Sequence, residues 1–238
     1  MDHKTDCLVC GKELDYLFTP VQTNCFYCRE KAETDVMCSG GHFVCDACHR
    51  LGAMDLIYRY CIRTSKHDPI VMATELMRSK KVAMHGPEHH FIVPAVLITA
   101  YYNTLGGITS ISEKEKKLRE ALRRSEKVPG GFCGFYGACG AAIGTGIFIS
   151  LVTGATPLAR QEWMLSNMMT SRSLSCIAHS GGPRCCKRDT YIALVEAVAF
   201  IEENLNVKIE IDPVIHCCFH SLNRECLKSA CPFYDEQV

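Results

Sequence analysis

A net charge is absent from this chain, whose 238 residues include 26 acidic and 26 basic side chains. Proteins that attract nucleic acids or anionic lipids through their overall charge carry an excess of lysine and arginine. Whole-molecule electrostatics therefore give no attraction to either partner, and we do not expect the chain to bind nucleic acid.

A secretory signal is also absent from the first residues, MDHKTDC, which contain neither a basic region nor an apolar region. We therefore expect a cytoplasmic protein, in a compartment that keeps thiols reduced. Under these conditions closely spaced cysteines favour metal coordination over disulfides.

Long apolar runs are scarce, and the stretch long enough to cross a membrane without a charge is residues 128–159. Eight glycines lie between Gly130 and Gly154, together with Cys133, Cys139 and Thr145. Small residues of this kind favour closely packed backbone in a protein interior, so we expect no membrane span.

Cysteine, by contrast, is abundant, and its 17 residues form two groups with Cys61 between them. Seven lie in the first 48 residues, and nine lie between Cys133 and Cys231. Two groups predict two kinds of metal site. The N-terminal group, which includes a histidine, offers eight metal donors: Cys7, Cys10, Cys25, Cys28, Cys38, His42, Cys45 and Cys48.

The N-terminal donors have the CxxC spacing of zinc knuckles, in which each pair supplies two thiolates to a tetrahedral ion. Eight donors close two zinc sites, which predicts a structural role. If the pairs are used in order, the first site takes Cys7, Cys10, Cys25 and Cys28. In a cross-braced module the first pair instead joins the third, and the spacing leaves both arrangements open. The stretch CSGGHFVCDAC resembles the middle of cross-braced modules such as RING domains.

The rest of the chain is predicted to be mainly helical, which gives a small α+β zinc-knuckle module over residues 1–50 and a helical domain over residues 51–238. Apolar residues recur at helical spacing from Asp46 onward, and proline at Pro87 with glycine at Gly106 delimits a helix with an apolar run. Ser112 is expected to cap a charged surface helix over residues 113–127. Further helices are expected over residues 158–179 and 189–205, and a short strand over residues 207–211.

The second cysteine group lacks a repeated CxxC spacing and lies among glycines and basic residues. We expect it to hold an iron–sulfur cluster of the 4Fe-4S type, assembled from distant segments, with zinc and free redox thiols as the alternatives. The sequence GGPRCCKR precedes a helix, where Arg184, Lys187 and Arg188 favour thiolates and anions. The candidate cluster ligands are Cys133, Cys139, Cys185, Cys186, Cys217, Cys218, Cys226 and Cys231.

The sequence MHGPEHH concentrates polar side chains at the start of a predicted helix. We expect His85, Glu88, His89 or Lys187 to transfer protons, and Arg184 to bind a substrate carboxylate. Capping of the helix and simple exposure are the alternative for the histidines.

Four motifs, MHGPEHH, GFCGFYGACGAAIGTG, GGPRCCKR and the closing Cys-Pro, resemble the domain of unknown function 5714 family of anaerobic bacteria and archaea, over nearly the whole chain. Some of its members are fused to methyltransferases, which implies a methyltransferase or redox partner. Residues 139–199 are also similar to the iron–sulfur domain of L-serine dehydratases and cysteine desulfidases. That similarity implies a cluster held by Cys139, by Cys185 or Cys186, and by one later cysteine, which acts as a Lewis acid on an amino acid.

These observations favour an iron–sulfur enzyme of anaerobic sulfur or amino-acid metabolism, which acts on a small molecule as a lyase or in sulfur transfer. The alternative is a zinc-stabilised binding or redox-sensing regulatory protein without enzymatic activity.

Overall fold

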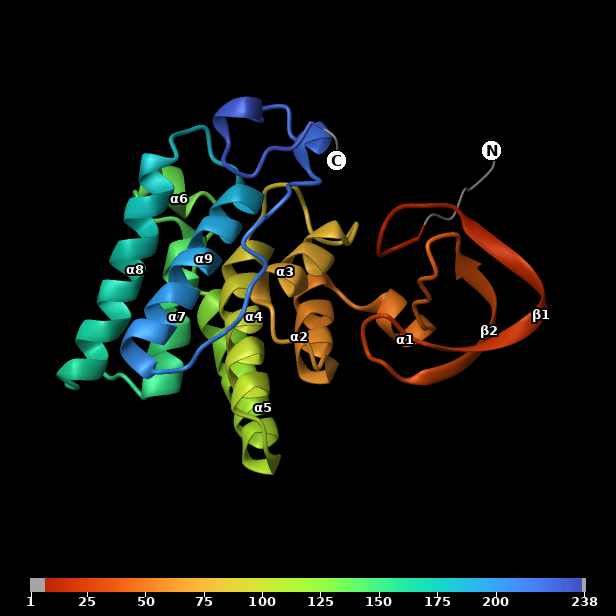
Figure 1. Ribbon diagram of the computed structural model, residues 1–238, viewed down its shortest axis with the longest axis horizontal. Helices are drawn as coiled ribbons and strands as arrows, with labels where there is room; N and C mark the ends of the chain where they lie inside the picture. The colour runs from red at the N-terminus through yellow and green to blue at the C-terminus, as the bar shows by residue number, and fades with distance from the viewer. Residues whose placement is uncertain (1–6, 237–238) are drawn as a thin grey trace.

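The computed structural model describes residues 7–236, apart from the side chains of residues 108 and 109. The segment in which a signal was sought, residues 1–6, lies outside the described residues. The chain is mainly α-helical with a small two-stranded sheet at its N-terminus, as predicted. Figure 1 shows this sheet beside a larger helical body.

The N-terminal part is a long β-hairpin framed by cysteine-containing turns. Strand β1 (Leu14–Asn24) pairs antiparallel with β2 (Lys31–Cys38), and the register shifts between Tyr16 and Val21. A short helix, α1 (Asp46–Arg50), begins after Cys45, contains Cys48 and leads into α2 (Ala53–Arg63). Little of the hairpin is buried, so its stability must come from elsewhere than a hydrophobic core.

Helix α4 (Glu88–Leu105) is the central element of the helical body. It contacts α2, α3 (Pro69–Arg78), α5 (Ile108–Ser125), α7 (Gly140–Thr153) and α9 (Cys186–Leu205). Residues 91–100 of α4 are all buried, which explains why its sequence is apolar on every side. The predicted boundaries of this helix, near Pro87 and Gly106, are confirmed.

A further layer packs on two of the helices that contact α4. Helix α8 (Gln161–His179) covers α7 and α9, and the short α6 (Phe132–Phe135) precedes α7. Gly144 of α7 faces Pro94 and Val93 of α4, where an added Cβ would lie 2.9 Å from the Pro94 ring. Gly140, Gly144 and Gly146 thus serve close packing, whereas other glycines of residues 128–159 have open space around them. Among the helices of residues 7–236, none is both long enough and apolar enough to cross a membrane.

Two local predictions are wrong. The charged helix begins at Ile108 and not after Ser112, because Gly107 already ends the preceding turn and nothing in residues 108–112 breaks a helix. Residues 207–211 form no strand, since no neighbouring strand offers hydrogen bonds there; Ile209 is buried against the helices instead.

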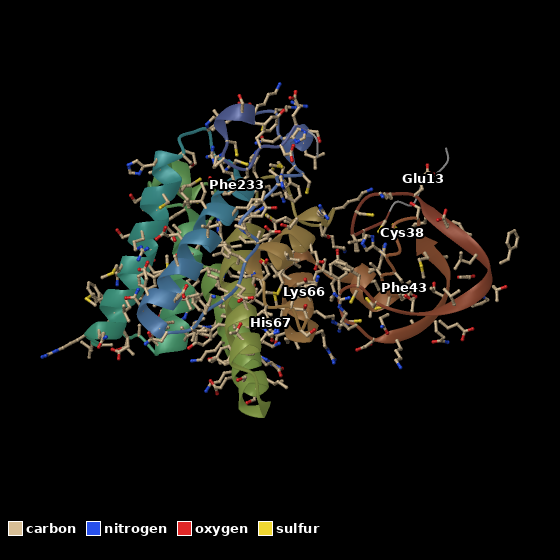
Figure 2. The ribbon with its side chains drawn as sticks, viewed as in Figure 1. Glu13, Cys38, Phe43, Lys66, His67 and Phe233 are labelled. Atoms are coloured by element: carbon tan, nitrogen blue, oxygen red, sulfur yellow. The ribbon has the colours of Figure 1, made fainter. Side chains whose placement is uncertain are left out.

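The C-terminal segment returns along the helical body to the start of α9 (Figure 1). It contains two 3-10 turns, η1 (His220–Leu222) and η2 (Lys228–Ala230), and it closes on itself through the bond from the Cys217 N–H to the Phe233 carbonyl, 2.7 Å. The Phe233 ring packs edge-on against Tyr191 of α9, with centroids 5.4 Å apart. This contact places the last cysteines over the beginning of α9. Figure 2 shows Phe233 there and Cys38 in the hairpin module.

Candidate metal centres

Cys7, Cys10, Cys38 and His42 form the first candidate centre. Their ligand atoms all lie within 4.8 Å of one another. The Sγ atoms of Cys10 and Cys38 are 3.4 Å apart, and Sγ of Cys38 is 3.7 Å from Nδ1 of His42. A tetrahedral ion with Zn–S bonds of about 2.3 Å holds neighbouring sulfurs about 3.8 Å apart. The spacing of this donor set therefore fits one tetrahedral metal ion.

Cys25, Cys28, Cys45 and Cys48 form the second candidate centre, again with all ligand atoms within 4.8 Å. Sγ of Cys28 lies 3.7 Å from Sγ of Cys45. Three of the four residues are buried. Both cysteine clusters can thus hold a metal ion.

The two centres are interleaved along the chain, because the first cysteine pair joins the third pair and the second joins the fourth. This is the cross-braced arrangement, one of the two that the spacing left open. The hydrogen bond from the Phe26 N–H to the Phe43 carbonyl, 2.8 Å, ties the second knuckle to the segment beyond His42. Between the first two and the last two ligands of one centre, the chain therefore contributes two ligands to the other centre.

Tight turns place the thiols of the first two pairs. The N–H of Gly11 bonds to the Cys7 carbonyl and the N–H of Arg29 to the Cys25 carbonyl. Gly11 and Arg29 both have positive φ, 75° and 60°, which reverses the chain after each CxxC.

Backbone N–H groups also point at the sulfurs, as the 3.1 Å contact from the Gly40 N–H to Sγ of Cys38 shows. Burial opposes ionisation of Cys38, but the Gly40 N–H and His42 outweigh it and lower the pKa of this thiol to about 6. Burial raises the pKa of Cys7 and of Cys28 to about 11. A bound cation would hold these thiols ionised, which is the state in which they are ligands.

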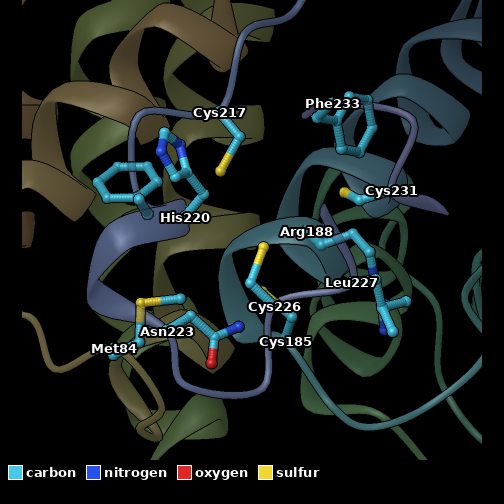
Figure 3. Close-up of a pocket in the computed structure, with 11 residues that line it drawn as sticks. Met84, Cys185, Arg188, Cys217, His220, Asn223, Cys226, Leu227, Cys231 and Phe233 are labelled. Atoms are coloured by element: carbon cyan, nitrogen blue, oxygen red, sulfur yellow. The ribbon is translucent and has the colours of Figure 1, made fainter. Parts of the chain in front are cut away.

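Four cysteines of the second group line one small cavity, with a free volume of about 20 Å³. They are Cys185, Cys217, Cys226 and Cys231. Figure 3 shows the sulfur atoms of Cys217, Cys226 and Cys231 turned toward the same space. Burial raises the pKa of Cys217 to about 11, and the neighbouring thiols of Cys185, Cys218 and Cys231 add to this shift. The rest of the lining is Met84, Arg188, Phe219, His220, Asn223, Leu227 and Phe233.

Separate elements bring these four thiols together. Cys185 is the N-cap of α9, and Cys217 is fixed by its bond to the Phe233 carbonyl. Cys226 follows η1, with its N–H on the Asn223 carbonyl at 3.2 Å, and Cys231 follows η2, with its N–H on the Lys228 carbonyl at 2.7 Å. The C-terminal segment therefore covers the first turn of α9 and contributes three of the four cysteines that line the cavity.

A buried arginine lies in the wall of this cavity. The side chain of Arg188 is only 3% exposed; its Nε donates to Oδ1 of Asp189 at 3.1 Å and its NH2 group donates to the Gly181 carbonyl at 2.8 Å. Its NH1 group and Nδ1 of His220 are buried without a hydrogen-bond partner. A buried cation with a free donor fits an anionic group in the cavity, since unpaired buried donors are costly.

The other four candidate cluster ligands lie outside this cavity. Sγ of Cys139 donates to Oδ2 of Asp189 at 3.9 Å, and the Cys218 sulfur accepts from Nε of Arg78 at 3.3 Å. Cys133 lines a neighbouring cleft, and Cys186 lies by the backbone N–H of Gly86. Within residues 7–236, no third set of donors lies within 4.8 Å. The eight candidates thus divide into four that share a cavity and four that do not.

The residues predicted to transfer protons lie next to this region. Nε2 of His85 is 3.2 Å from Oδ1 of Asn223, which lines the cavity. His89 is 1% exposed and its Nδ1–H donates to the Gly86 carbonyl at 3.0 Å. Burial lowers the pKa of His89 to about 3, helped by the charge of Lys187, so this imidazole is neutral.

Lys187 and Glu88 are also enclosed. The Lys187 ammonium donates to the carbonyls of Met77 and Ala83 at 3.2 and 3.1 Å, and burial lowers its pKa to about 8. The Glu88 carboxylate packs against Gly86, and its Oε2 has no hydrogen-bond partner. Arg184 is exposed and lines the neighbouring cleft.

The sequence did not single out Asp189, His220 or Asn223, although all three contribute to the site. For His220 and Asn223 the available signal is their position among the C-terminal cysteines. Asp189 looks like an ordinary acidic residue in a first helical turn until its contacts with Arg188 and Cys139 are seen.

Residues 57–234 match the family model of DUF5714, described as a family of unknown function. The chain belongs to this family, and the resemblance predicted from its motifs is confirmed. The match includes the four-cysteine cavity and begins after the cross-braced centres. No curated protein and no solved structure matches this chain.

Proposed function

We propose that this chain is an iron–sulfur protein with a zinc-stabilised N-terminal module. Cys185, Cys217, Cys226 and Cys231 would hold a 4Fe-4S cluster, and the two cross-braced centres would each hold one structural zinc ion. The observation that carries the proposal is the convergence of four thiols on one cavity beside a buried arginine.

The spacing of the four thiols favours a cluster over a third zinc ion. A single ion draws its ligand atoms within bonding distance of one centre, as in the N-terminal sites. The four sulfurs of the cavity do not all lie within 4.8 Å of one another. In a cubane cluster each thiolate binds a different iron, so its thiolates lie further apart than those around a single ion. Its negative charge would be balanced by the guanidinium of Arg188, which lies in the cavity wall.

The proposed role is enzymatic, in anaerobic sulfur or amino-acid metabolism, as a lyase or in sulfur transfer. When bound, the cluster would supply a Lewis acid that polarises a leaving group if one of the four thiolates gives up its iron to the substrate. Arg188 would hold the negative charge at the cavity wall. His85 would hold a proton at the edge of the cavity, where its Nε2 lies 3.2 Å from Oδ1 of Asn223. The buried Lys187 and His89 lie behind the wall and would position the first turn of α9.

A second role is favoured by one specific observation, the presence of four lining cysteines and not three. Four thiolates occupy every iron of a cubane, which leaves the cluster to carry or sense electrons without binding a substrate. In that case a redox or methyltransferase partner protein would meet the chain in the cytoplasm.

Metal analysis of anaerobically purified protein tests the proposal. We expect iron and acid-labile sulfide in cluster ratio together with zinc, and broad visible absorbance. Cys185→Ser and Cys226→Ser should lose iron and keep zinc. Cys133→Ser and Cys218→Ser are matched controls, because these thiols lie outside the cavity, and they should keep both metals. Colourless protein with zinc alone, or controls that lose iron as fully as Cys185→Ser, would contradict the assignment.

The electron paramagnetic resonance spectrum of the reduced cluster separates the two roles. A spectrum that changes when L-serine or L-cysteine is added indicates an iron that accepts a ligand, as the enzymatic role requires. An unchanged spectrum with a reversible potential supports electron transfer or sensing.

A further inference from the structure

A second hollow lies against the cysteine cavity and shares one wall residue with it. This cleft is open to solvent, with a volume of about 640 Å³, within the range of small-molecule sites. Arg188 contributes to the lining of both the cleft and the cavity. The other lining residues of the cleft are Gly131, Cys133, Gly134, Phe135, Ile177, Ala178, Gly181, Gly182, Arg184 and Asp189.

The charges of this cleft are unbalanced. Arg184 and Arg188 contribute two guanidinium groups, whereas Asp189 contributes one carboxylate. That carboxylate is already engaged, since its Oδ1 accepts from Nε of Arg188 and its Oδ2 from the Cys139 thiol. The NH1 group of Arg188 is buried without a partner. One exposed cation and one unpaired buried donor therefore remain for an anion.

The floor of the cleft is bare backbone. At Gly134, Gly181 and Gly182, nothing lies within 4 Å of where a Cβ would be, so a ligand can approach the main chain closely. The apolar side consists of Phe135, Ile177 and Ala178. A short aliphatic body fits this side while its charged end meets the arginines.

We propose that the cleft binds a small aliphatic carboxylic acid through Arg184 and Arg188. The planar carboxylate matches the forked donors of guanidinium, which favour two-oxygen anions. A carboxylate held by Arg188 lies one side chain away from the four-cysteine cavity. The inference rests on the proposed enzymatic role, in which a substrate must lie beside the cysteine cavity, and it names the chemical class of that substrate.

Calorimetric titration of the anaerobic full-length protein tests the inference. The probes are L-serine and propionate, with L-serine amide and propionamide as partners that lack the carboxylate, and inorganic phosphate as the competing anion. We expect the acids to bind at least tenfold more tightly than their amides and than phosphate. Equal binding of acid and amide, tighter binding of phosphate, or no binding at all would overturn the inference.

Two variants test the residues. Arg184→Ala should weaken the binding of the acids at least tenfold and leave the binding of the amides unchanged. Arg188→Lys keeps a cation beside Asp189 but removes the NH1 donor, and it should weaken the acids to a similar degree. Arg160→Ala is the matched control, since this exposed arginine lies at the far end of α8 and should leave binding intact. Unchanged binding by Arg184→Ala would refute the site.

Failure of the cleft and failure of the cluster give different results. Arg184→Ala should keep its iron, which shows that lost binding is not lost cluster. Cys226→Ser should lose iron and still bind the acids, because its thiol lies in the cavity and not in the cleft. Wild-type protein without iron that binds the acids would contradict the proposed function and leave the cleft standing. Protein that contains iron but does not bind the acids would contradict the cleft and leave the proposed cluster standing.

Discussion

Cys10 and Cys38 are 28 positions apart in the chain, yet their Sγ atoms lie 3.4 Å from each other. The whole β-hairpin and the second cysteine pair lie between them, and that pair belongs to the other centre. With metal bound, the first centre would hold the open end of the hairpin and the second centre its connecting turn, residues 25–30. This explains how strands with little buried surface keep a fixed shape.

Double variants should distinguish the cross-brace from sequential pairing. Cys10→Ser with Cys38→Ser removes two ligands from one centre, so we expect one zinc ion per chain to remain. Cys10→Ser with Cys25→Ser damages both centres and should leave none. Zinc content measured by elemental analysis checks both variants, and Cys176→Ser, which removes an exposed thiol on α8, should keep two ions. Sequential pairing predicts the reverse pattern for the double variants.

The helical fold could be predicted from the sequence because its signals are local. Pro87 and Gly106 delimit α4, and the apolar run between them predicts a buried helix, which is what the structure contains. The strand expected over residues 207–211 failed because a strand depends on a partner elsewhere in the chain. Helix α5 begins earlier than predicted, at Ile108. Ser112 has the sequence of a helix cap, but the residues before it are already helical.

The candidate site could be predicted only as a set of residue types. The spacing of Cys185, Cys217 and Cys231 contains no information on which thiols share a cavity, since this depends on the return of the C-terminal segment along the helices. Cys186 and Cys218 are adjacent in sequence to cavity residues but face elsewhere. The role of Asp189 depends on contacts with a side chain 50 positions away.

Tyr60→Phe should destabilise the packing of α2 against α3, next to the junction with the hairpin module. Tyr60 is fully buried on α2, its hydroxyl donates to the Glu75 carboxylate, and its ring stacks on Phe26 of the module at 6.2 Å. Loss of a buried bond to a charged group costs about 2 kcal/mol. Urea denaturation followed by circular dichroism measures the change. Tyr136→Phe, at an exposed ring, is the control; an equal effect of both variants would refute the role of the hydroxyl.

Gly140→Ala should destabilise the packing of α7 against α4. A Cβ at Gly140 would overlap the His90 ring, and this ring cannot swing away because its Nδ1 is bonded to the Val128 carbonyl at 3.0 Å. Overpacking of this kind costs about 2 kcal/mol, which exceeds the gain in helix propensity of about 1 kcal/mol. Thermal unfolding measures the difference. Gly134→Ala is the control, since open space surrounds that position, and the prediction fails if the two variants melt together.

His89 should make folding sensitive to acid. Its pKa is lowered from 6.5 to about 3 by burial, and Lys187 of α9, His90 of α4 and His85 beside it disfavour the charged form further. Between pH 6.5 and pH 3, His89 binds a proton in the unfolded state but stays neutral in the folded state. The contribution of His89 to the free energy of unfolding is therefore complete above pH 6.5 and is lost as the pH falls toward 3. Between pH 6.5 and pH 5 the loss is about 2 kcal/mol.

His89→Asn keeps a donor for the Gly86 carbonyl and does not titrate, so its free energy of unfolding should fall less steeply with acid than that of the wild type. The slope and not the absolute value is compared, because the smaller side chain also leaves a void. Urea denaturation of metal-saturated protein at pH 6.5, 6, 5.5 and 5 gives both slopes. His67→Asn, at an exposed histidine, should retain the wild-type slope. Identical slopes for His89→Asn and the wild type would show that another group controls acid unfolding.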